Sequence, residues 1–317
     1  MTVTQAQGSA FERLRAGDPA MLARALSVLE AGGPAADGLR ARLHAVVGSA
    51  TVVGFTGPPG VGKSTLVNAY IEELRRQERT VAVLAVDPSS PVSGGAILGD
   101  RTRMGQHTSD PGVFVRSVAS RGHLGGLALA VPAMLDAVDV AGFDHIVLEA
   151  VGAGQSEVEI SRFADVTVVL AAPGLGDDVQ AIKAGILEVA DVLAVNKADL
   201  PLAEQTARQL QSMLELRDAT RLPAVLRVSA TERRGIDDLV AAVEAAREAI
   251  GDPGGGPQRR ATELLRQATV AEVQRRLAAG ALADLGAAMH RGELSLADAV
   301  DHLLTQTIHA PRKDAHG

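Results

Sequence analysis

The stretch from Gly57 to Thr65, Gly-Pro-Pro-Gly-Val-Gly-Lys-Ser-Thr, places the strongest constraint on what this chain can fold into. It fits the pattern G-x-x-x-x-G-K-[ST], with a β-branched apolar run over 51–56 before it and a helical pattern over 66–76 after it. Glycines in such a loop let backbone N–H groups surround phosphates, and the following helix adds the positive end of its dipole. A chance glycine-rich turn would lack this strand and this helix. The stretch therefore predicts a binding site for a nucleoside triphosphate.

Every residue of this loop is expected to contact the nucleotide. The Lys63 ammonium can reach the outer phosphates, which makes it a candidate catalytic residue, and the Ser64 hydroxyl can hold Mg²⁺. The predicted contacts of the loop are Gly57, Pro58, Pro59, Gly60, Val61, Gly62, Lys63, Ser64 and Thr65.

Apolar, β-rich runs alternate with helical stretches between residues 49 and 250. This alternation predicts an α/β fold, a P-loop domain with a mostly parallel sheet flanked by helices. Residues 1–48 read as an N-terminal helical preface, because Asp18 and Pro19 suit the N-cap and first position of a helix. Apolar residues then follow at helical spacing, namely Leu22, Leu26 and Leu29.

A glycine- and proline-rich break over 251–257 ends the central domain and begins a C-terminal helical arm, 251–317. The arm contains two amphipathic helical patterns, and each apolar stripe must be buried somewhere. A homodimer formed through the arm is the preferred interpretation. Packing of the arm against its own central domain is the alternative.

Two carboxylates are expected near the metal. Asp87 ends the uniformly apolar run 80–86, so it should lie in the crevice at the carboxyl ends of the strands and hold Mg²⁺ through a water. A helix N-cap is the alternative role for Asp87. Asp100 lies in a long glycine-rich segment, 91–111, of the kind that often carries function, and we place it near the metal or the attacking water.

A second phosphate-sensing motif follows the strand predicted over 145–148. Many GTPases carry D-x-x-G at this place, and the corresponding residues here are Glu149 and Gly152. Glu149 is a candidate magnesium ligand, and the Gly152 N–H would sense the γ-phosphate. Gln155 is a candidate for orienting water or transmitting the state of the switch.

The strand predicted over 192–195 ends in Asn196-Lys197-Ala198-Asp199, which fits N-K-x-D. The Asp199 carboxylate can accept both the N1–H and the N2–H₂ of guanine, whereas adenine would leave it unpaired. After the next strand, one backbone N–H of Ser229, Ala230 or Thr231 can meet guanine O6. The order of these motifs, each at a strand end, predicts that the nucleotide is GTP.

The composition excludes several other roles. A net charge of −7 and an aromatic content of 2% make nucleic-acid binding a poor expectation. The absence of cysteine excludes disulfides and thiolate metal sites, and it suits a reducing cytoplasm. The sequence shows no signal peptide pattern and no apolar run of membrane-spanning length, so we expect a cytoplasmic protein without a membrane partner.

Together these motifs resemble the MeaB/ArgK family of P-loop GTPases, also called the LAO/AO type, which includes the human methylmalonic aciduria type A protein. The resemblance covers nearly the whole chain. Its most distinctive part is Ala-Val-Asp-Pro-Ser-Ser with the following Gly-Gly-Ala-Ile-Leu-Gly-Asp-Arg-Thr-Arg-Met, within 85–104. The stretches 149–157, 176–183 and 196–199 also match.

The resemblance implies a GTPase chaperone for an adenosylcobalamin-dependent acyl-CoA mutase, usually methylmalonyl-CoA mutase. GTP binding and hydrolysis would be coupled to loading and protection of the mutase, and the adenosylcobalamin would belong to the mutase. By the same resemblance, the chain would dimerise through its arm, Asp87, Asp100 and Glu149 would serve magnesium and the switches, and Lys183 would belong to a third switch.

Two positions depart from the family pattern. Ala150 replaces a threonine found in many members, and Pro91-Val92-Ser93 replaces Thr-Arg-Thr. Either change fits a subfamily that serves a sister mutase. Two other functions stay open as alternatives: a P-loop kinase or ATPase that acts on a protein or small molecule, and a metal-delivery GTPase.

Overall fold

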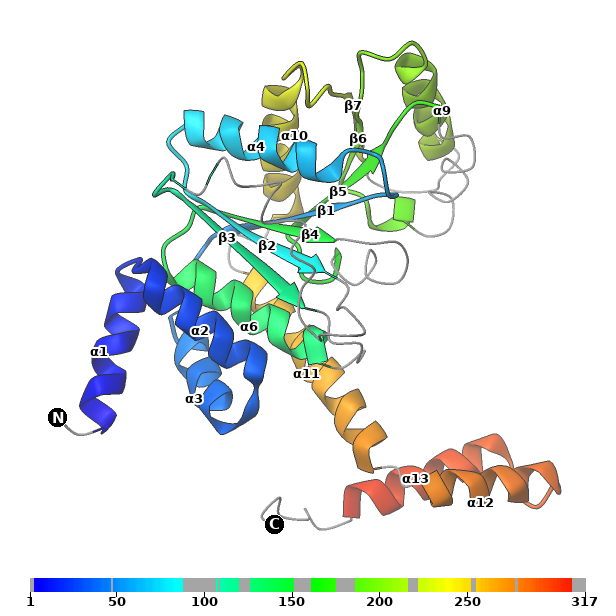
Figure 1. Ribbon diagram of the computed structural model, residues 1–317. Helices are drawn as coiled ribbons and strands as arrows, with labels where there is room; N and C mark the ends of the chain where they lie inside the picture. Colours follow the sequence, from blue (N-terminus) through cyan, green and yellow to red (C-terminus); the bar gives the residue numbers. More distant parts are fainter. Residues whose placement is uncertain are drawn as a thin grey trace. The chain divides into compact units, whose positions relative to one another are not determined.

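The computed structural model describes residues 3–46, 48–87, 107, 109–119, 126–150, 161–174, 186–215, 222–251, 255–276 and 279–309. The chain forms two compact units, Met1–Glu263 and Leu264–Gly317. Figure 1 shows the first unit as a sheet with helices on both of its faces.

The first unit is built on a seven-stranded sheet in the order β3-β2-β4-β1-β5-β6-β7. All neighbouring strands are parallel, which confirms the predicted α/β fold. The carboxyl ends of the strands therefore lie along one edge, and the loops that follow them meet there. The strands are β1 Thr51–Thr56, β2 Val81–Asp87, β3 Val113–Ala119, β4 His145–Ala150, β5 Val166–Ala171, β6 Val192–Val195 and β7 Ala224–Arg227.

Helices cover both faces of the sheet, which explains why the inner strands are apolar on both sides (Figure 1). One face packs against α4, Lys63–Arg76, and α10, Ile236–Ile250. The other face packs against α6, Gly126–Val140, and, beyond β1, against α9, Ala203–Glu215, and the short 3₁₀ helix η2, Ile186–Val189.

The N-terminal helices belong to the same compact unit as the sheet. They are α1 Val3–Arg15, α2 Pro19–Ala31 and α3 Gly33–His44, and both α2 and α3 pack on α6. Asp18 caps α2, since its carboxylate accepts from Ala20 N at 2.9 Å and Met21 N at 3.2 Å, and Pro19 begins the helix. The predicted cap is therefore confirmed, and the predicted apolar stripe of α2 is buried.

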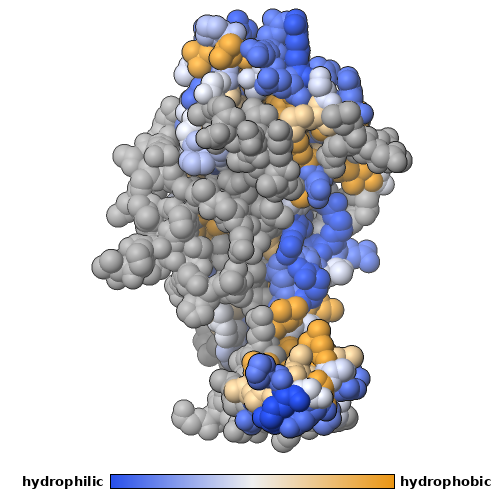
Figure 2. Space-filling model, turned by 90° about the vertical axis from the view of Figure 1, so that its right-hand side faces the viewer, coloured by the Kyte–Doolittle hydropathy of each residue, from blue (hydrophilic) through white to orange (hydrophobic). Residues whose placement is uncertain are grey.

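The C-terminal unit is helical and leaves apolar side chains exposed. Helix α11, Gly255–Arg276, begins in the first unit and continues into the second, which also contains α12, Ala279–His290, and α13, Leu296–His309. Leu265 and Leu296 are each 68% exposed. Figure 2 shows apolar residues on the surface of the helices of this unit, at the foot of the view. Among the described residues, no helix combines the length and the hydropathy that crossing a membrane requires.

Candidate nucleotide site

The loop between β1 and α4 has a conformation that only glycine fits at two positions. Gly57 has φ 146° and Gly62 has φ 92°, both in the region that side chains rarely adopt. A Cβ on Gly57 would lie 2.6 Å from Leu170 O, and a Cβ on Gly62 would lie 2.6 Å from Asn196 Nδ2. The loop is therefore packed directly against β5 and against the end of β6.

Lys63 is the first residue of α4, and its ammonium folds over its own loop. Lys63 Nζ donates to Gly57 O and, at 3.2 Å, to Pro58 O. Gly62 is the N-cap of α4 and has no side chain to accept from the first N–H groups of the helix, so these groups are not capped by it. A positive side chain and a helix N-terminus thus meet in one loop, which is the arrangement that binds phosphates.

Ser64 and Glu149 join α4 to β4. The Ser64 hydroxyl donates to Glu149 Oε1 at 2.7 Å, and the Glu149 side chain is 1% exposed. The sequence placed Glu149 just after its strand, but β4 continues through Ala150, so Glu149 stands inside the sheet and pairs in register with Phe55. Its side chain lies on the same face as α4, because it alternates with Leu148.

These two oxygens suit magnesium, which prefers hydroxyl and carboxylate ligands. Asp87 is the last residue of β2 and pairs in register with Ala119, which places it at the same edge of the sheet. The other predicted switch residues lie outside the described residues; they are Asp100, Gly152, Gln155 and Lys183.

Asn196 and Lys197 tie the end of β6 to the phosphate loop. Asn196 Nδ2 donates to Val61 O at 3.0 Å, and Lys197 Nζ donates to Gly60 O at 2.9 Å. Lys197 adopts φ 56° at the turn that follows β6, a conformation that is rare for residues other than glycine. The first two residues of the N-K-x-D motif therefore support the phosphate loop.

Asp199 is held by the loop that follows β7. The Ser229 hydroxyl donates to Asp199 Oδ1 at 2.6 Å, and this hydrogen bond is the main cause of the lowered pKa of Asp199. The carboxylate is exposed and ionised at neutral pH, as an acceptor of two guanine donors must be. Ala230 N donates to Asn196 Oδ1 at 3.3 Å, and Thr231 Oγ1 lies 3.3 Å from Ser229 Oγ.

A backbone bridge that was not predicted from the sequence closes the loop after β7. Ser229 and Arg234 exchange two backbone hydrogen bonds, Ser229 N to Arg234 O at 3.0 Å and Arg234 N to Ser229 O at 3.1 Å. Arg233 and Gly235 flank this bridge with positive φ angles of 54° and 71°. Gly235 alone marks such a turn in the sequence. The bridge fixes the position of the Ser229 hydroxyl that holds Asp199.

A parallel sheet with a glycine-rich lysine loop after β1 and N-K-x-D after β6 defines the class of P-loop GTPases. The model of the family described as methylmalonyl-CoA mutase-associated GTPase MeaB matches residues 22–283. The chain belongs to this family, and its predicted activity as a GTPase is confirmed at that level.

Three similar proteins extend the comparison. GTPase ArgK of Escherichia coli is 38% identical over 276 residues, which cover 83% of each chain. The mouse protein named methylmalonic aciduria type A homolog, mitochondrial, is 38% identical over 59% of this chain and 46% of its own length. A crystal structure of an LAO/AO transport system kinase superposes with a TM-score of 0.75 at 28% identity and covers 98% of this chain and 100% of the other.

Proposed function

We propose that this chain uses GTP binding and hydrolysis to gate adenosylcobalamin loading of an acyl-CoA mutase and to protect that mutase. The observation that carries the guanine assignment is the pair of contacts that fix Asp199 and Asn196. Ser229 holds the Asp199 carboxylate at 2.6 Å, and Asn196 joins this base site to Val61 of the phosphate loop at 3.0 Å.

In the proposed reaction, water attacks the γ-phosphorus in line as the bond from phosphorus to the β–γ bridging oxygen breaks, which gives GDP and phosphate. Lys63 and the loop amides would hold the phosphates. Magnesium, when bound, neutralises phosphate charge, and Ser64 and Glu149 would hold it together with Asp87 and Asp100. The intrinsic rate is expected to be slow, because charge stabilisation is completed only in the complex with the partner.

The partner is proposed from the family and from the C-terminal unit. The family is described by its association with methylmalonyl-CoA mutase, and a mutase of this cobalamin-dependent class is the proposed client. A homodimer through the arm, residues 251–317, is the proposed assembly, because apolar residues such as Leu265 and Leu296 are exposed there. The cytoplasm is the proposed compartment.

Calorimetry with GTP, GDP, ATP and xanthosine diphosphate in the presence of magnesium tests the guanine assignment. Asp199→Asn is expected to lose GDP affinity and gain xanthosine diphosphate affinity, since xanthine carries an oxygen where guanine carries N2. Asp298→Asn is the matched control, because Asp298 of the C-terminal unit also accepts from a serine, Ser295 Oγ, at 2.6 Å. Preference for ATP in the unaltered chain would overturn the proposal.

The client is tested with purified mutase. A methylmalonyl-CoA mutase or a sister mutase is expected to copurify with this chain and to accelerate its GTP turnover. If every candidate mutase leaves the rate unchanged while GTP binds normally, the chaperone function is wrong and the nucleotide site stands.

A further inference from the structure

A polar cleft opens at the edge of the sheet opposite the nucleotide site. Its volume is about 370 Å³, and it is lined by residues that precede β1, β2 and β4 and by α10. Thr51, at the start of β1, lines this cleft, whereas Thr56 at the other end leads into the phosphate loop. At about 3.3 Å per residue, the six residues of β1 place the two sites roughly 20 Å apart.

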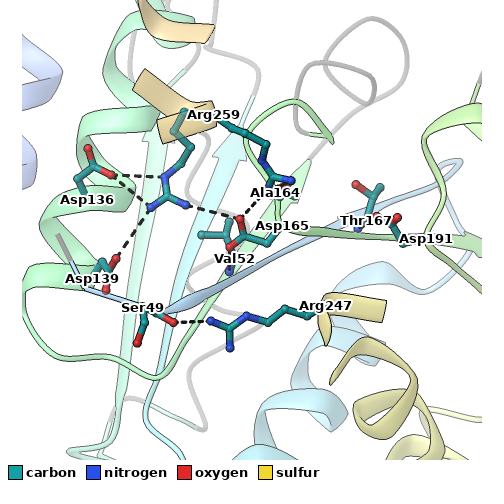
Figure 3. A network of polar contacts seen from close by, with 11 residues as sticks. Ser49, Val52, Asp136, Asp139, Ala164, Asp165, Thr167, Asp191, Arg247 and Arg259 are labelled. Atoms are coloured by element: carbon teal, nitrogen blue, oxygen red, sulfur yellow. Dashed lines mark hydrogen bonds and ion pairs between the residues drawn. The ribbon is translucent and has the colours of Figure 1, made fainter. Parts of the chain in front are cut away.

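Two guanidinium groups line the cleft, those of Arg79 and Arg247. In the part of the chain that the structure describes, neither Arg79 nor Arg247 forms an ion pair, and Arg247 Nη2 donates to Ser49 O at 2.7 Å (Figure 3). Neighbouring arginines differ, since Arg75 pairs with Asp110 at 3.0 Å and Arg259 with Asp165 at 2.8 Å. Cationic groups left unpaired around a cleft attract an anionic ligand.

His145 adds a neutral donor to the same cleft. Burial, with a smaller contribution from the charge of Arg79, lowers the pKa of His145 to about 4, so the imidazole is uncharged at neutral pH. His145 is 4% exposed, and its Nδ1 is enclosed without a hydrogen-bond partner among the described parts of the chain. Enclosing a lone pair costs less than enclosing an N–H, so we assign the proton to Nε2, which can donate into the cleft.

The carboxylates of the cleft are mostly engaged elsewhere. Asp139 accepts from Ala50 N at 3.1 Å, and Asp144 accepts from Thr80 N at 2.7 Å and from Thr80 Oγ1 at 2.9 Å. Glu244 is the one that makes no hydrogen bond or ion pair among the described residues. The charge of Arg79 also helps to lower the pKa of Asp144. Among the described residues, the cleft thus combines two guanidinium groups that form no ion pair with one carboxylate, Glu244, that accepts no hydrogen bond.

We propose that this cleft binds the phosphate group of a small phosphorylated molecule. Two guanidinium forks, the His145 N–H and the Ser49 hydroxyl offer donors from several directions, which suits a tetrahedral oxyanion, whereas one arginine fork serves a planar carboxylate. The volume holds a phosphate with a small organic group. This site does not depend on the proposed activity of the nucleotide site.

Inorganic phosphate and phenyl phosphate are the probes, and ³¹P NMR line broadening is the measurement. The phosphate loop is first filled with GDP and magnesium, and in a separate sample it is disabled by Lys63→Ala. Broadening is expected in both samples. Arg79→Gln and Arg247→Gln are each expected to weaken binding about tenfold or more, because each removes a charge-assisted hydrogen bond. Arg76→Gln is the matched control, since Arg76 is an exposed arginine that pairs with Glu73.

Two further measurements, on Glu244→Gln and on His145, test the phosphate site. Glu244→Gln is expected to tighten phosphate binding about two- to fivefold, because it removes the uncommitted negative charge. The ring resonances of His145 are expected to report the Nε2–H form and to shift on phosphate addition.

Equal phosphate binding by the unaltered chain and by the Arg79→Gln/Arg247→Gln double variant, with unchanged melting temperatures, would overturn the proposed site. Failure of GDP to bind would count against the nucleotide site alone, because the Lys63→Ala sample needs no nucleotide.

Discussion

Replacing Arg260 by leucine tests a buried charge network of the first unit. The Arg260 side chain is 2% exposed and faces three carboxylates. Its Nε lies 3.4 Å from Asp136 Oδ1, its Nη2 lies 3.9 Å from Asp139 Oδ2, and its Nη1 lies 3.8 Å from Asp165 Oδ1. Figure 3 labels these three aspartates. Asp136 and Asp139 are themselves buried. Arg260→Leu would leave Asp139 without its guanidinium neighbour, and Asp136 would keep His44, whose Nδ1 lies 3.3 Å from Asp136 Oδ2 and carries a charge only when protonated.

The burial of these groups sets how much stability Arg260→Leu should lose. Breaking a buried ion pair by removing one partner costs about 3–5 kcal/mol of the free energy of unfolding. In a unit of this size each kcal/mol corresponds to roughly 2–4 °C, so the melting temperature should fall by about 6–20 °C. Urea unfolding followed by circular dichroism measures the first quantity, and a thermal scan measures the second.

The stability that Arg260→Leu loses should depend on pH. Burial raises the pKa of Asp136 and of Asp139, and the charge of Arg260 opposes that rise. When the pKa of a group is higher in the folded than in the unfolded chain, the group stabilises the fold at pH values below its unfolded pKa. This stabilisation is lost as the pH rises through the folded pKa. Without Arg260 both pKa values rise further, so the deficit should be largest near pH 7 and should shrink toward about pH 4.

Arg259→Leu is the control for this experiment. Arg259 lies next in the chain and pairs with Asp165 at 2.8 Å, but its side chain is 45% exposed, so its loss should cost at most about 1 kcal/mol. Adding Asp136→Asn to Arg260→Leu should recover part of the stability. A deficit below about 1 kcal/mol at pH 7, or one that stays the same as pH falls, would refute the reasoning.

Three further outcomes are expected. Ser229→Ala should raise the pKa of Asp199, so that calorimetry shows GDP affinity falling at a higher pH on acidification than in the unaltered chain. Gly62→Ala should weaken GDP binding about tenfold or more, because its Cβ would lie 2.6 Å from Asn196 Nδ2 at φ 92°; unchanged affinity would contradict the packing of the loop. Tyr70→Phe should keep or raise the melting temperature, because the buried Tyr70 hydroxyl makes no hydrogen bond to any residue that the structure describes; a marked fall would reveal a partner.

The sheet could be predicted from the sequence because its inner strands are covered on both faces. β1 and β5 are buried at every position, and such strands appear in the sequence as continuous apolar runs. The loop after β1 and the N-K-x-D motif after β6 are local in sequence, so their positions at the strand ends could also be predicted. The predicted domain boundaries at 48/49 and 250/251 stay predictions.

Contacts between distant residues could not be predicted. The Ser64–Glu149 hydrogen bond joins residues 85 positions apart, and it depends on β4 extending through Ala150, which only the sheet register determines. Arg260 follows a glycine- and proline-rich stretch and resembles an exposed helical arginine in the sequence. Its partner Asp136 lies 124 positions away on α6, and no periodicity links the two.

The strand that leads to the nucleotide is also held at its other end. Asp139 accepts from Ala50 N at 3.1 Å and Asp165 accepts from Val52 N at 2.9 Å, and both carboxylates face Arg260 of α11. A slip of β1 by one residue would exchange the side chains between its two faces and would break both hydrogen bonds. Arg260 therefore links the start of α11 to the two carboxylates that hold the beginning of β1, the strand that leads into the phosphate loop.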